Sequence, residues 1–210
     1  HKAYNRVRES NFSLEKLVGF DLHGKTVGVI GTGKIGAIFC KIMLGFGCKV
    51  IAYDLYPDEN LKKMGVVYEP IDQIFEQSQI ISLHCPLTPE THHIIDEKAI
   101  SKMQKGVMIV NTSRGALVDT TAALSGLKSR KIGNLAIDVY EQEETLFFQD
   151  LSGEILEDEE ITRLLTFPNV LITAHQSFFT HEALLQIATT TLQNVLDFAK
   201  EVELVNEIKF

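Results

Sequence analysis

The sequence has little that would suit a membrane, a nucleic acid or a disulfide framework. Its apolar runs are strand-sized and interrupted, so none could span a bilayer. The formal net charge of -8 at pH 7 comes without a concentrated basic face, which nucleic-acid binding requires. We therefore expect no membrane partner and no nucleic-acid partner. An anionic small ligand would depend on local positive groups.

The three cysteines, Cys40, Cys48 and Cys85, are odd in number, far apart and never in a CxxC pair. This argues against a disulfide framework or a structural zinc and for a reducing compartment. The polar start, HKAYNRVRES, has no apolar segment of the kind found in signal peptides. These features predict a cytoplasmic protein without a bound metal. The start also lacks an initiator methionine, so we expect the sequence to be a fragment whose natural beginning is missing.

Short runs rich in β-branched residues alternate with helix-like segments from residue 25 onward. Most of these runs are continuously apolar, which is typical of strands covered on both faces. The expected strands occupy residues 25–31, 49–54, 65–69, 79–85, 107–112, 134–140 and 169–174. This alternation predicts an α/β fold with a doubly wound parallel sheet.

Helical segments are expected between and after these strands. Apolar residues recur at helical spacing after the first strand, before a closing GFG; they are Ile35, Ile38, Ile42, Met43 and Phe46. Another helix is expected over 119–132, with Asp119 as its N-cap. Two segments interrupt the alternation: an acidic connection over 141–168, with a helix around 157–165, and a long amphipathic helix over 180–201. A connection as long as the first is usually functional or disordered.

The sequence GTGKIG directly follows the first expected strand and opens the first expected helix. It has the GxGxxG spacing, with Gly31, Gly33 and Gly36. In this context the first glycine permits a tight turn, the second lets the backbone approach a pyrophosphate, and the third lets the helix pack on the strand. The helix N-terminus, with Lys34 and Ile35 in its first turn, then faces the phosphates. The motif predicts a Rossmann-type dinucleotide-binding domain.

The next expected strand ends in Asp54, close to the distance of about 20 residues at which an acid binds the ribose hydroxyls of NAD. An acid at this position repels a 2′-phosphate and so favours NAD over NADP. The simpler interpretation of Asp54 is a solvated strand end. Lys62 and Lys63 lie close in the sequence and leave the strictness of the NAD preference open.

Polar side chains follow the later strands at their carboxyl ends, where ligands bind in doubly wound sheets. They are His84, Cys85 and Pro86 after one strand, Asn111 to Arg114 after the next, Asp138, Glu141 and Glu143 after the third, and His175 after the last. A histidine that merely ends a strand is the simpler interpretation of His175. An arginine, carboxylates and a histidine meeting at one edge make a chemical role the better interpretation.

Five motifs, GVIGTGKIG, HCPLTPET, VNTSRGALVD, DVYEQE and AHQSFFT, occur in an order that resembles the D-isomer-specific 2-hydroxyacid dehydrogenases. The resemblance implies NAD as the cofactor, Arg114 as the substrate-binding arginine, Glu143 as the catalytic glutamate and His175 as the catalytic histidine. In keto acid reduction the arginine grips the substrate carboxylate. The histidine donates a proton to the carbonyl oxygen as hydride arrives, and the glutamate stabilises the protonated ring.

The resemblance also implies a cofactor lining that acts largely through backbone atoms: His84, Cys85, Pro86, Asn111 and Thr112. Asp138 has two interpretations, contact with the nicotinamide end of the cofactor or a role in holding its loop. Cys85 is expected to pack rather than act as a nucleophile, because hydride transfer needs none. His92 and His93 are expected at the surface. His181 is not assigned to a metal site, because no further ligand cluster supports one.

Within the family, the sequence is most similar to the D-lactate branch, because a long connection follows Glu143 and QSFFT follows His175. Ala174, where relatives often carry Pro or Gly, is a small departure. The implied reaction is NADH-dependent reduction of pyruvate to D-lactate by a homodimer. Three alternatives stay open: a relative acting on glycerate or a bulkier keto acid, an NAD-sensing corepressor or scaffold, and a dinucleotide-binding module without catalysis.

Three parts are expected along the chain: an N-terminal arm over 1–24, an NAD-binding domain over 25–178, and a C-terminal helix and tail over 179–210. The resemblance implies a second, substrate-binding domain, built mainly from residues that precede the start of this sequence. Only remnants of that domain are therefore expected here. We expect the sequence as given to bind NAD(H) but to turn over poorly.

Overall fold

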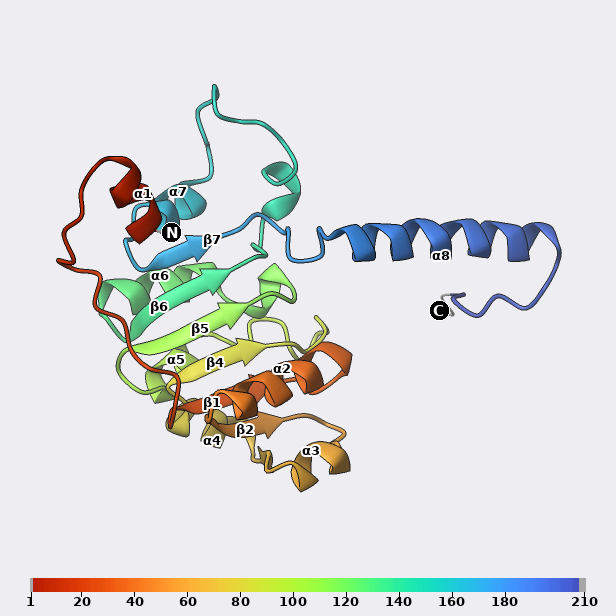
Figure 1. Cartoon of the computed structure of the whole chain (residues 1–210), viewed down its shortest axis with the longest axis horizontal. Coiled ribbons are helices and arrows are strands. Elements are labelled where there is room, and N and C mark those ends of the chain that lie inside the picture. Colours follow the sequence, from red (N-terminus) through yellow and green to blue (C-terminus); the bar gives the residue numbers. More distant parts are fainter. Residues whose placement is uncertain (1, 208–210) are drawn as a thin grey trace.

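The computed structural model describes residues 2–207, and its centre is a parallel seven-stranded β-sheet (Figure 1). The strands lie in the order β3-β2-β1-β4-β5-β6-β7. Their bounds are β1 Thr26–Ile30, β2 Lys49–Tyr53, β3 Val67–Tyr68, β4 Ile80–Leu83, β5 Val107–Asn111, β6 Ile132–Ile137 and β7 Val170–Ile172. The order runs outward in both directions from β1 and β4, so the predicted doubly wound sheet is confirmed. In such sheets, ligands bind beyond the carboxyl ends of the strands where the order reverses.

The helices are α1 Lys2–Arg8, α2 Lys34–Gly45, α3 Glu59–Lys63, α4 Ile71–Gln77, α5 Glu97–Lys102, α6 Thr120–Lys128, α7 Glu159–Leu165 and α8 His181–Ala199. Helices cover both faces of the sheet, but α1 and α8, which bury none of their residues, are not among them. Helices α2 and α3 contact each other, while α4 to α7 form a second row. Alternate residues of β1 point to separate apolar clusters, with Val27 and Val29 in one and Ile30 in the other. The sheet is therefore buried on both faces, which explains the continuously apolar strands.

Most of the expected elements are present close to their predicted bounds. Strand β6 begins at Ile132, slightly before its expected start. The predicted N-cap of α6 is confirmed, because the Asp119 carboxylate accepts a hydrogen bond from the Ala122 backbone nitrogen at 2.9 Å. The helix expected around 157–165 is α7, and the helix expected over 180–201 is α8. The acidic connection between β6 and β7 thus contains α7 and a short 3₁₀ turn at Glu143–Thr145.

The buried residues of helix α2 are Gly36, Cys40 and Met43, so only Met43 of its predicted apolar stripe packs on the sheet. The other apolar residues that predicted this helix are largely exposed: Ile35 72%, Ile38 57%, Ile42 49% and Phe46 53%. The helix was correctly predicted, but most of the stripe faces away from the sheet. The close approach of α2 to the sheet favours a glycine and a cysteine on its inner face.

Helix α8 projects away from the sheet and buries none of its residues (Figure 1). It exposes a set of large apolar side chains: Leu184, Leu185, Ile187, Leu192, Val195, Leu196 and Phe198. An apolar face of this extent usually belongs to an interaction surface. Among residues 2–207, no helix is both long enough and apolar enough to cross a bilayer.

Candidate active site

The turn between β1 and α2 has the shape that the glycine pattern predicts. Gly31 has a φ of +93°, and a Cβ there would lie 2.5 Å from the backbone nitrogen of Cys85. A Cβ at Gly36 would lie 2.0 Å from the Gly31 carbonyl oxygen, so α2 starts directly against the turn. A Cβ at Gly33 would meet nothing within 4 Å. Gly33 therefore leaves open space at the N-terminus of α2, where backbone N–H groups favour a phosphate.

Asp54 lies just beyond the carboxyl end of β2, beside the glycine turn. Its Oδ2 accepts hydrogen bonds from the backbone nitrogen and the hydroxyl of Thr32, at 2.6 and 3.1 Å. Its Oδ1 accepts from the Tyr56 backbone nitrogen at 2.8 Å. The acid is therefore tied to the residue between the first two glycines, and is not a freely solvated strand end. Sequence reasoning missed Thr32, although a hydroxyl inside the glycine motif was a visible signal.

Asn111 is 1% exposed and holds the turn that carries Arg114. Its Nδ2 donates to the Arg114 carbonyl at 2.8 Å, and its Oδ1 accepts from the Ser113 nitrogen at 3.0 Å. The Ser113 hydroxyl donates to the Cys85 carbonyl at 2.7 Å, which ties the turn to the end of β4. The sequence predicted a backbone role for Asn111, but its side chain is an anchor of this turn.

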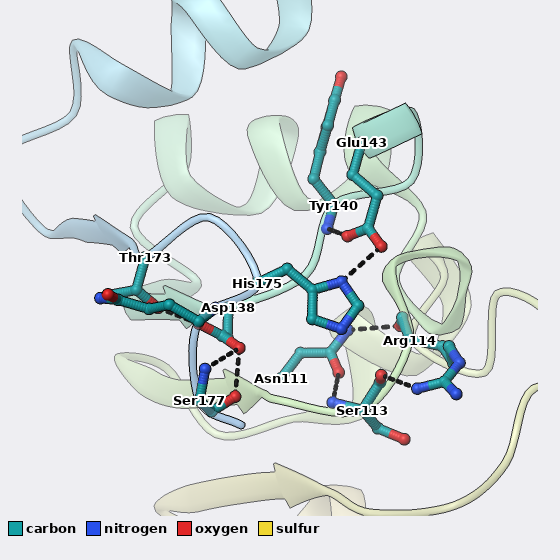
Figure 2. Close-up of polar contacts among 10 residues, drawn as sticks. Asn111, Ser113, Arg114, Asp138, Tyr140, Glu143, Thr173, His175 and Ser177 are labelled. Carbon is teal, nitrogen blue, oxygen red and sulfur yellow. Dashed lines mark hydrogen bonds and ion pairs between the residues drawn. The ribbon is translucent and has the colours of Figure 1, made fainter. Parts of the chain in front are cut away.

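The guanidinium of Arg114 is exposed at this edge (Figure 2). Within residues 2–207 its only hydrogen bond goes to the neighbouring Ser113 carbonyl, at 2.8 Å, and it forms no ion pair. Its charge is therefore available to a ligand carboxylate. An open pocket of about 380 Å³ lies beside it, lined by His84, Cys85, Pro86, Leu87, Ser113 and Arg114. The structure thus brings together residues predicted from two separate strands.

His84 and Cys85 lie partly or fully below the surface of this pocket. Burial lowers the pKa of His84 to about 4, so its ring is neutral near pH 7. Its Nε2 is 2.9 Å from the Ser82 hydroxyl. Burial raises the pKa of Cys85 to about 11, with a small further contribution from the charge of Asp54 and a backbone hydrogen bond opposing the shift. A protonated, buried thiol is a poor nucleophile, in keeping with the packing role predicted for Cys85.

His175 and Glu143 are hydrogen bonded to each other, with 2.8 Å between His175 Nδ1 and Glu143 Oε1 (Figure 2). The other oxygen of Glu143 accepts from the Tyr140 backbone nitrogen at 2.9 Å, so the carboxylate is fixed between ring and backbone. Because Nδ1 faces a carboxylate, it carries a proton, and Nε2 is the ring atom left to exchange a proton with a ligand. The His175 side chain is 29% exposed, so a ligand can reach it.

The turn of Arg114 adjoins the segment that carries Glu143. A Cβ at Gly115 would lie 2.1 Å from the carbonyl oxygen of Tyr140, so the two backbones are in close contact. The Asp138 backbone nitrogen also donates to the Asn111 carbonyl at 2.9 Å. The arginine, the glutamate and the histidine therefore come to one edge of the sheet, as the sequence predicted.

Asp138 holds the loop that carries His175. It is 3% exposed, and its carboxylate accepts hydrogen bonds from the Thr173 hydroxyl, the Gln176 and Ser177 backbone nitrogens and the Ser177 hydroxyl (Figure 2). Burial disfavours its charged form, but these hydrogen bonds outweigh burial and lower the pKa of Asp138. The loop-holding interpretation thus has direct support, while contact with a cofactor stays a prediction.

The loop held by Asp138 has an unusual backbone. Ala174 and His175 have φ values of +46° and +52°, a left-handed conformation that non-glycine residues rarely adopt. The His175 backbone nitrogen donates to the Asp138 carbonyl. Since left-handed residues persist only where surrounding contacts fix them, the bonds to Asp138 determine where the His175 ring lies.

His93 belongs to this edge of the molecule as well. The sequence predicted His92 and His93 as surface residues; His92 is exposed, and His93 is only partly exposed. His93 is partly buried, and its Nε2 is 2.6 Å from Glu141 Oε1. The other oxygen of Glu141 accepts from the Thr120 hydroxyl at 3.2 Å. This second histidine–glutamate pair joins the loop after β4 to the loop after β6 and to the start of α6.

The remaining predicted residues are accessible. Lys34 and Ile35 are exposed in the first turn of α2, Thr112 is exposed after β5, and Pro86 is exposed after β4. Their contacts with a cofactor stay predictions.

The sequence matches the family model described as "D-isomer specific 2-hydroxyacid dehydrogenase, NAD binding domain" over residues 1–177. It is 51% identical over 202 residues to 2-hydroxyacid dehydrogenase homolog 1 of Schizosaccharomyces pombe, covering 96% of this chain and 61% of that protein. It is 51% identical over 208 residues to D-lactate dehydrogenase of Escherichia coli K12, and the match covers 99% of this chain and 63% of that protein. The solved structure of a pyruvate reductase of Chlamydomonas reinhardtii superposes with a TM-score of 0.94 at 44% identity. The superposition covers 98% of this chain and 62% of that one. The chain thus spans about three fifths of the length of these relatives, and it belongs to the D-isomer specific 2-hydroxyacid dehydrogenase family, of which it carries the NAD-binding domain.

Proposed function

We propose that the whole protein is an NAD-dependent D-lactate dehydrogenase, which reduces pyruvate to D-lactate. The observation that carries the proposal is the His175–Glu143 pair, with its free ring nitrogen on the same edge of the sheet as the exposed Arg114. The names of relatives add support for lactate, because proteins about half identical to this chain are called D-lactate dehydrogenases.

The residues of the chain divide the chemistry among them. When bound, NADH supplies the hydride that reduces the keto carbon. Arg114 binds the substrate carboxylate through two parallel N–H···O bonds, which orients the keto group. The Nε2 of His175 donates the proton that the keto oxygen needs as it becomes a hydroxyl. Glu143 holds the ring so that Nε2 faces the substrate. In the open space at Gly33, the N-terminus of α2 would hold the pyrophosphate, and Asp54 the ribose.

The test is NADH oxidation by the whole protein with pyruvate, hydroxypyruvate, phenylpyruvate and oxaloacetate, followed by determination of the chirality of the product. A preference for pyruvate with a D-configured product supports the proposal. A preference for hydroxypyruvate or phenylpyruvate would place the protein with relatives that act on glycerate or on bulkier acids. NADH binding without turnover of any of the four acids would contradict an enzymatic function and favour an NAD-sensing corepressor or scaffold.

We also propose the domain boundaries given above: an arm over 1–24, the NAD-binding domain over 25–178, and a segment over 179–210 that packs on a substrate-binding domain. The exposed apolar side chains of α8 support the last part.

A cytoplasmic homodimer is part of the proposal. The exposed apolar residues of α2 support self-association, and the three unpaired cysteines agree with a reducing compartment. Light scattering of the purified whole protein would test the dimer.

The glycine turn gives a prediction that separates binding from folding. Gly33→Ala is expected to weaken NADH binding about 5- to 100-fold without lowering stability, because the new methyl group occupies the open space. Gly36→Ala is instead expected to lower the free energy of unfolding by about 1–3 kcal/mol, because its methyl group meets the Gly31 carbonyl. Fluorescence titration with NADH and urea unfolding measure the two effects. Gly153→Ala, at an exposed site with no atom within 4 Å, is the control. Equal losses of binding in both turn variants would contradict the assignment.

A further inference from the structure

A continuous chain of hydrogen bonds joins Tyr68, at the end of β3, to Asp54, beyond the end of β2. The Tyr68 hydroxyl donates to Thr32 Oγ1 at 2.9 Å, and Thr32 Oγ1 is in turn 3.1 Å from Asp54 Oδ2. Behind Tyr68, the backbone nitrogen of Asp58 donates to the Tyr68 hydroxyl at 3.0 Å. The carboxylate can only accept, and the backbone nitrogen can only donate. The two hydroxyls between them therefore have a single direction for their protons, toward Asp54.

These hydrogen bonds hold the Oδ2 atom of Asp54 and leave its Oδ1 atom more accessible. Oδ2 is held by both the backbone nitrogen and the hydroxyl of Thr32, which is 7% exposed. Within the described residues, Oδ1 accepts only from the Tyr56 nitrogen, so it keeps a lone pair for a ribose hydroxyl. A carboxylate that is already fixed loses less freedom when a ligand binds. Its charge also stays where it would repel a 2′-phosphate.

Tyr68 also borders a cation that could otherwise offset the charge of Asp54. The Nζ of Lys62 lies 5.7 Å from the centre of the Tyr68 ring and 2.6 Å from Glu59 Oε1. Lys62 is therefore engaged with the aromatic ring and with a carboxylate. Lys62 is therefore less available to bind a 2′-phosphate than its position in the sequence suggested.

We propose that Tyr68 is a positioning residue that sets the preference of this domain for NAD(H) over NADP(H), acting through Thr32 on Asp54. The inference rests on the NAD-binding role of the domain and on the predicted contact of Asp54 with ribose, and it does not depend on which keto acid is reduced. Without the Tyr68 hydroxyl, the Thr32 hydroxyl is free to rotate away, and the Thr32 backbone nitrogen is then the one donor left to Asp54 Oδ2. The carboxylate is held less firmly, so ribose meets a less fixed acceptor and a 2′-phosphate meets less repulsion.

The test compares the dissociation constants of NADH and NADPH for the 210-residue chain, measured by cofactor fluorescence. In Tyr68→Phe, which keeps the ring beside Lys62, the ratio of the NADPH to the NADH constant is expected to fall about 3- to 10-fold. This corresponds to the loss of one ordinary hydrogen bond. Thr32→Val is expected to lower the ratio to a similar degree or further, and Thr32→Ser, which keeps the hydroxyl, is expected to preserve it.

The double variant Tyr68→Phe with Thr32→Val tests whether Tyr68 acts on Asp54 through Thr32. If Tyr68 acts through Thr32, the double variant has the same ratio as Thr32→Val alone. A further fall in the ratio would overturn the relay. Tyr53→Phe removes a phenol hydroxyl from the neighbouring strand end and is the matched control, with an unchanged ratio expected.

A purely structural role for Tyr68 would change both constants by the same factor, so an unchanged ratio in Tyr68→Phe would overturn the proposal. Thermal unfolding of each variant accompanies the titrations, and Thr32→Ser supplies a folded comparison if Thr32→Val is unstable. Failure of the wild-type chain to prefer NADH would also overturn the proposal. Cofactor binding without keto acid turnover would contradict the proposed enzymatic function and leave this inference intact.

Discussion

Replacing His175 with glutamine in the whole protein is expected to lower kcat for pyruvate reduction by about 10²–10⁴-fold, the usual contribution of general acid–base catalysis. Glutamine is polar and of similar size, but its amide cannot release and regain a proton near neutral pH. NADH affinity is expected to change little, because the glycine turn and Asp54 lie on other strands. Stopped-flow reduction with enzyme in excess measures the chemical step directly, and fluorescence titration measures cofactor affinity.

A matched control for this substitution is available in the same segment. His181→Gln makes the identical chemical change at the exposed first residue of α8, and turnover is expected to stay at the wild-type level. If His175→Gln reduced pyruvate as fast as His181→Gln does, His175 would not be the acid.

Replacing Glu143 is expected to lower activity little further once His175 has been replaced. Its Oε1 contacts the His175 ring and its Oε2 is held by the Tyr140 backbone, so it is placed to orient the ring. Glu143→Gln is therefore expected to slow the wild-type protein but to add little in the His175→Gln background, because residues that act as a unit are not additive. Additive losses in the two variants would assign Glu143 a separate role.

The elements that sequence reasoning predicted well are those in which local pattern and chemistry agree. The glycine spacing at Gly31, Gly33 and Gly36 constrains the backbone of a single turn, and the structure has that turn. The doubly wound parallel sheet could be predicted because parallel strands joined by helices follow few topologies. The meeting of Glu143 and His175 followed from the rule that polar residues past the strand ends share one edge.

The features that the sequence did not predict depend on tertiary contacts between residues that are distant in the sequence. The buried face of α2 is decided by how closely the helix approaches β1, so Gly36 and Cys40 face inward while Ile35 and Ile38 stay exposed. Whether a polar side chain binds cofactor or holds a loop depends on which donors surround it. Nothing near Asp138 in the sequence identifies its partners, which lie 35–39 residues further along. The same holds for His93, whose partner Glu141 is 48 residues away.

Removing the carboxylate of Asp138 is expected to disable the site without touching a catalytic group. In Asp138→Ala, two hydroxyls and two backbone N–H groups of the 173–177 loop lose their common acceptor. The free energy of unfolding is expected to fall by about 1.5–3 kcal/mol, the usual contribution of hydrogen bonds to a charged group. The left-handed backbone at Ala174 and His175 is expected to relax, and kcat to fall by about 10²-fold, because a shift of about 1 Å at a reacting group has that effect. Hydrogen exchange at Gln176 and Ser177 should rise in parallel.

Asp138→Asn refines this prediction, because it changes the charge and one acceptor but hardly changes the shape. An amide oxygen can still accept from Thr173 and Gln176, but the amide nitrogen then faces the Ser177 nitrogen, donor against donor. The expected loss is smaller than in Asp138→Ala but still measurable by urea unfolding. The exposed Asp21→Asn is the control, with no loss expected.

The contribution of Asp138 to the free energy of unfolding is expected to depend on pH. Since the hydrogen bonds lower the pKa of Asp138 in the folded protein, its stabilising contribution is complete above the unfolded-state value of about 3.9 and is lost as the pH falls through the lower folded value. The difference in unfolding free energy between wild type and Asp138→Asn should therefore be constant from pH 7 to about pH 5 and shrink at about pH 3 and below. A difference that grew in acid would mean that Asp138 is protonated in the folded protein, and the loop would then owe its shape to other contacts.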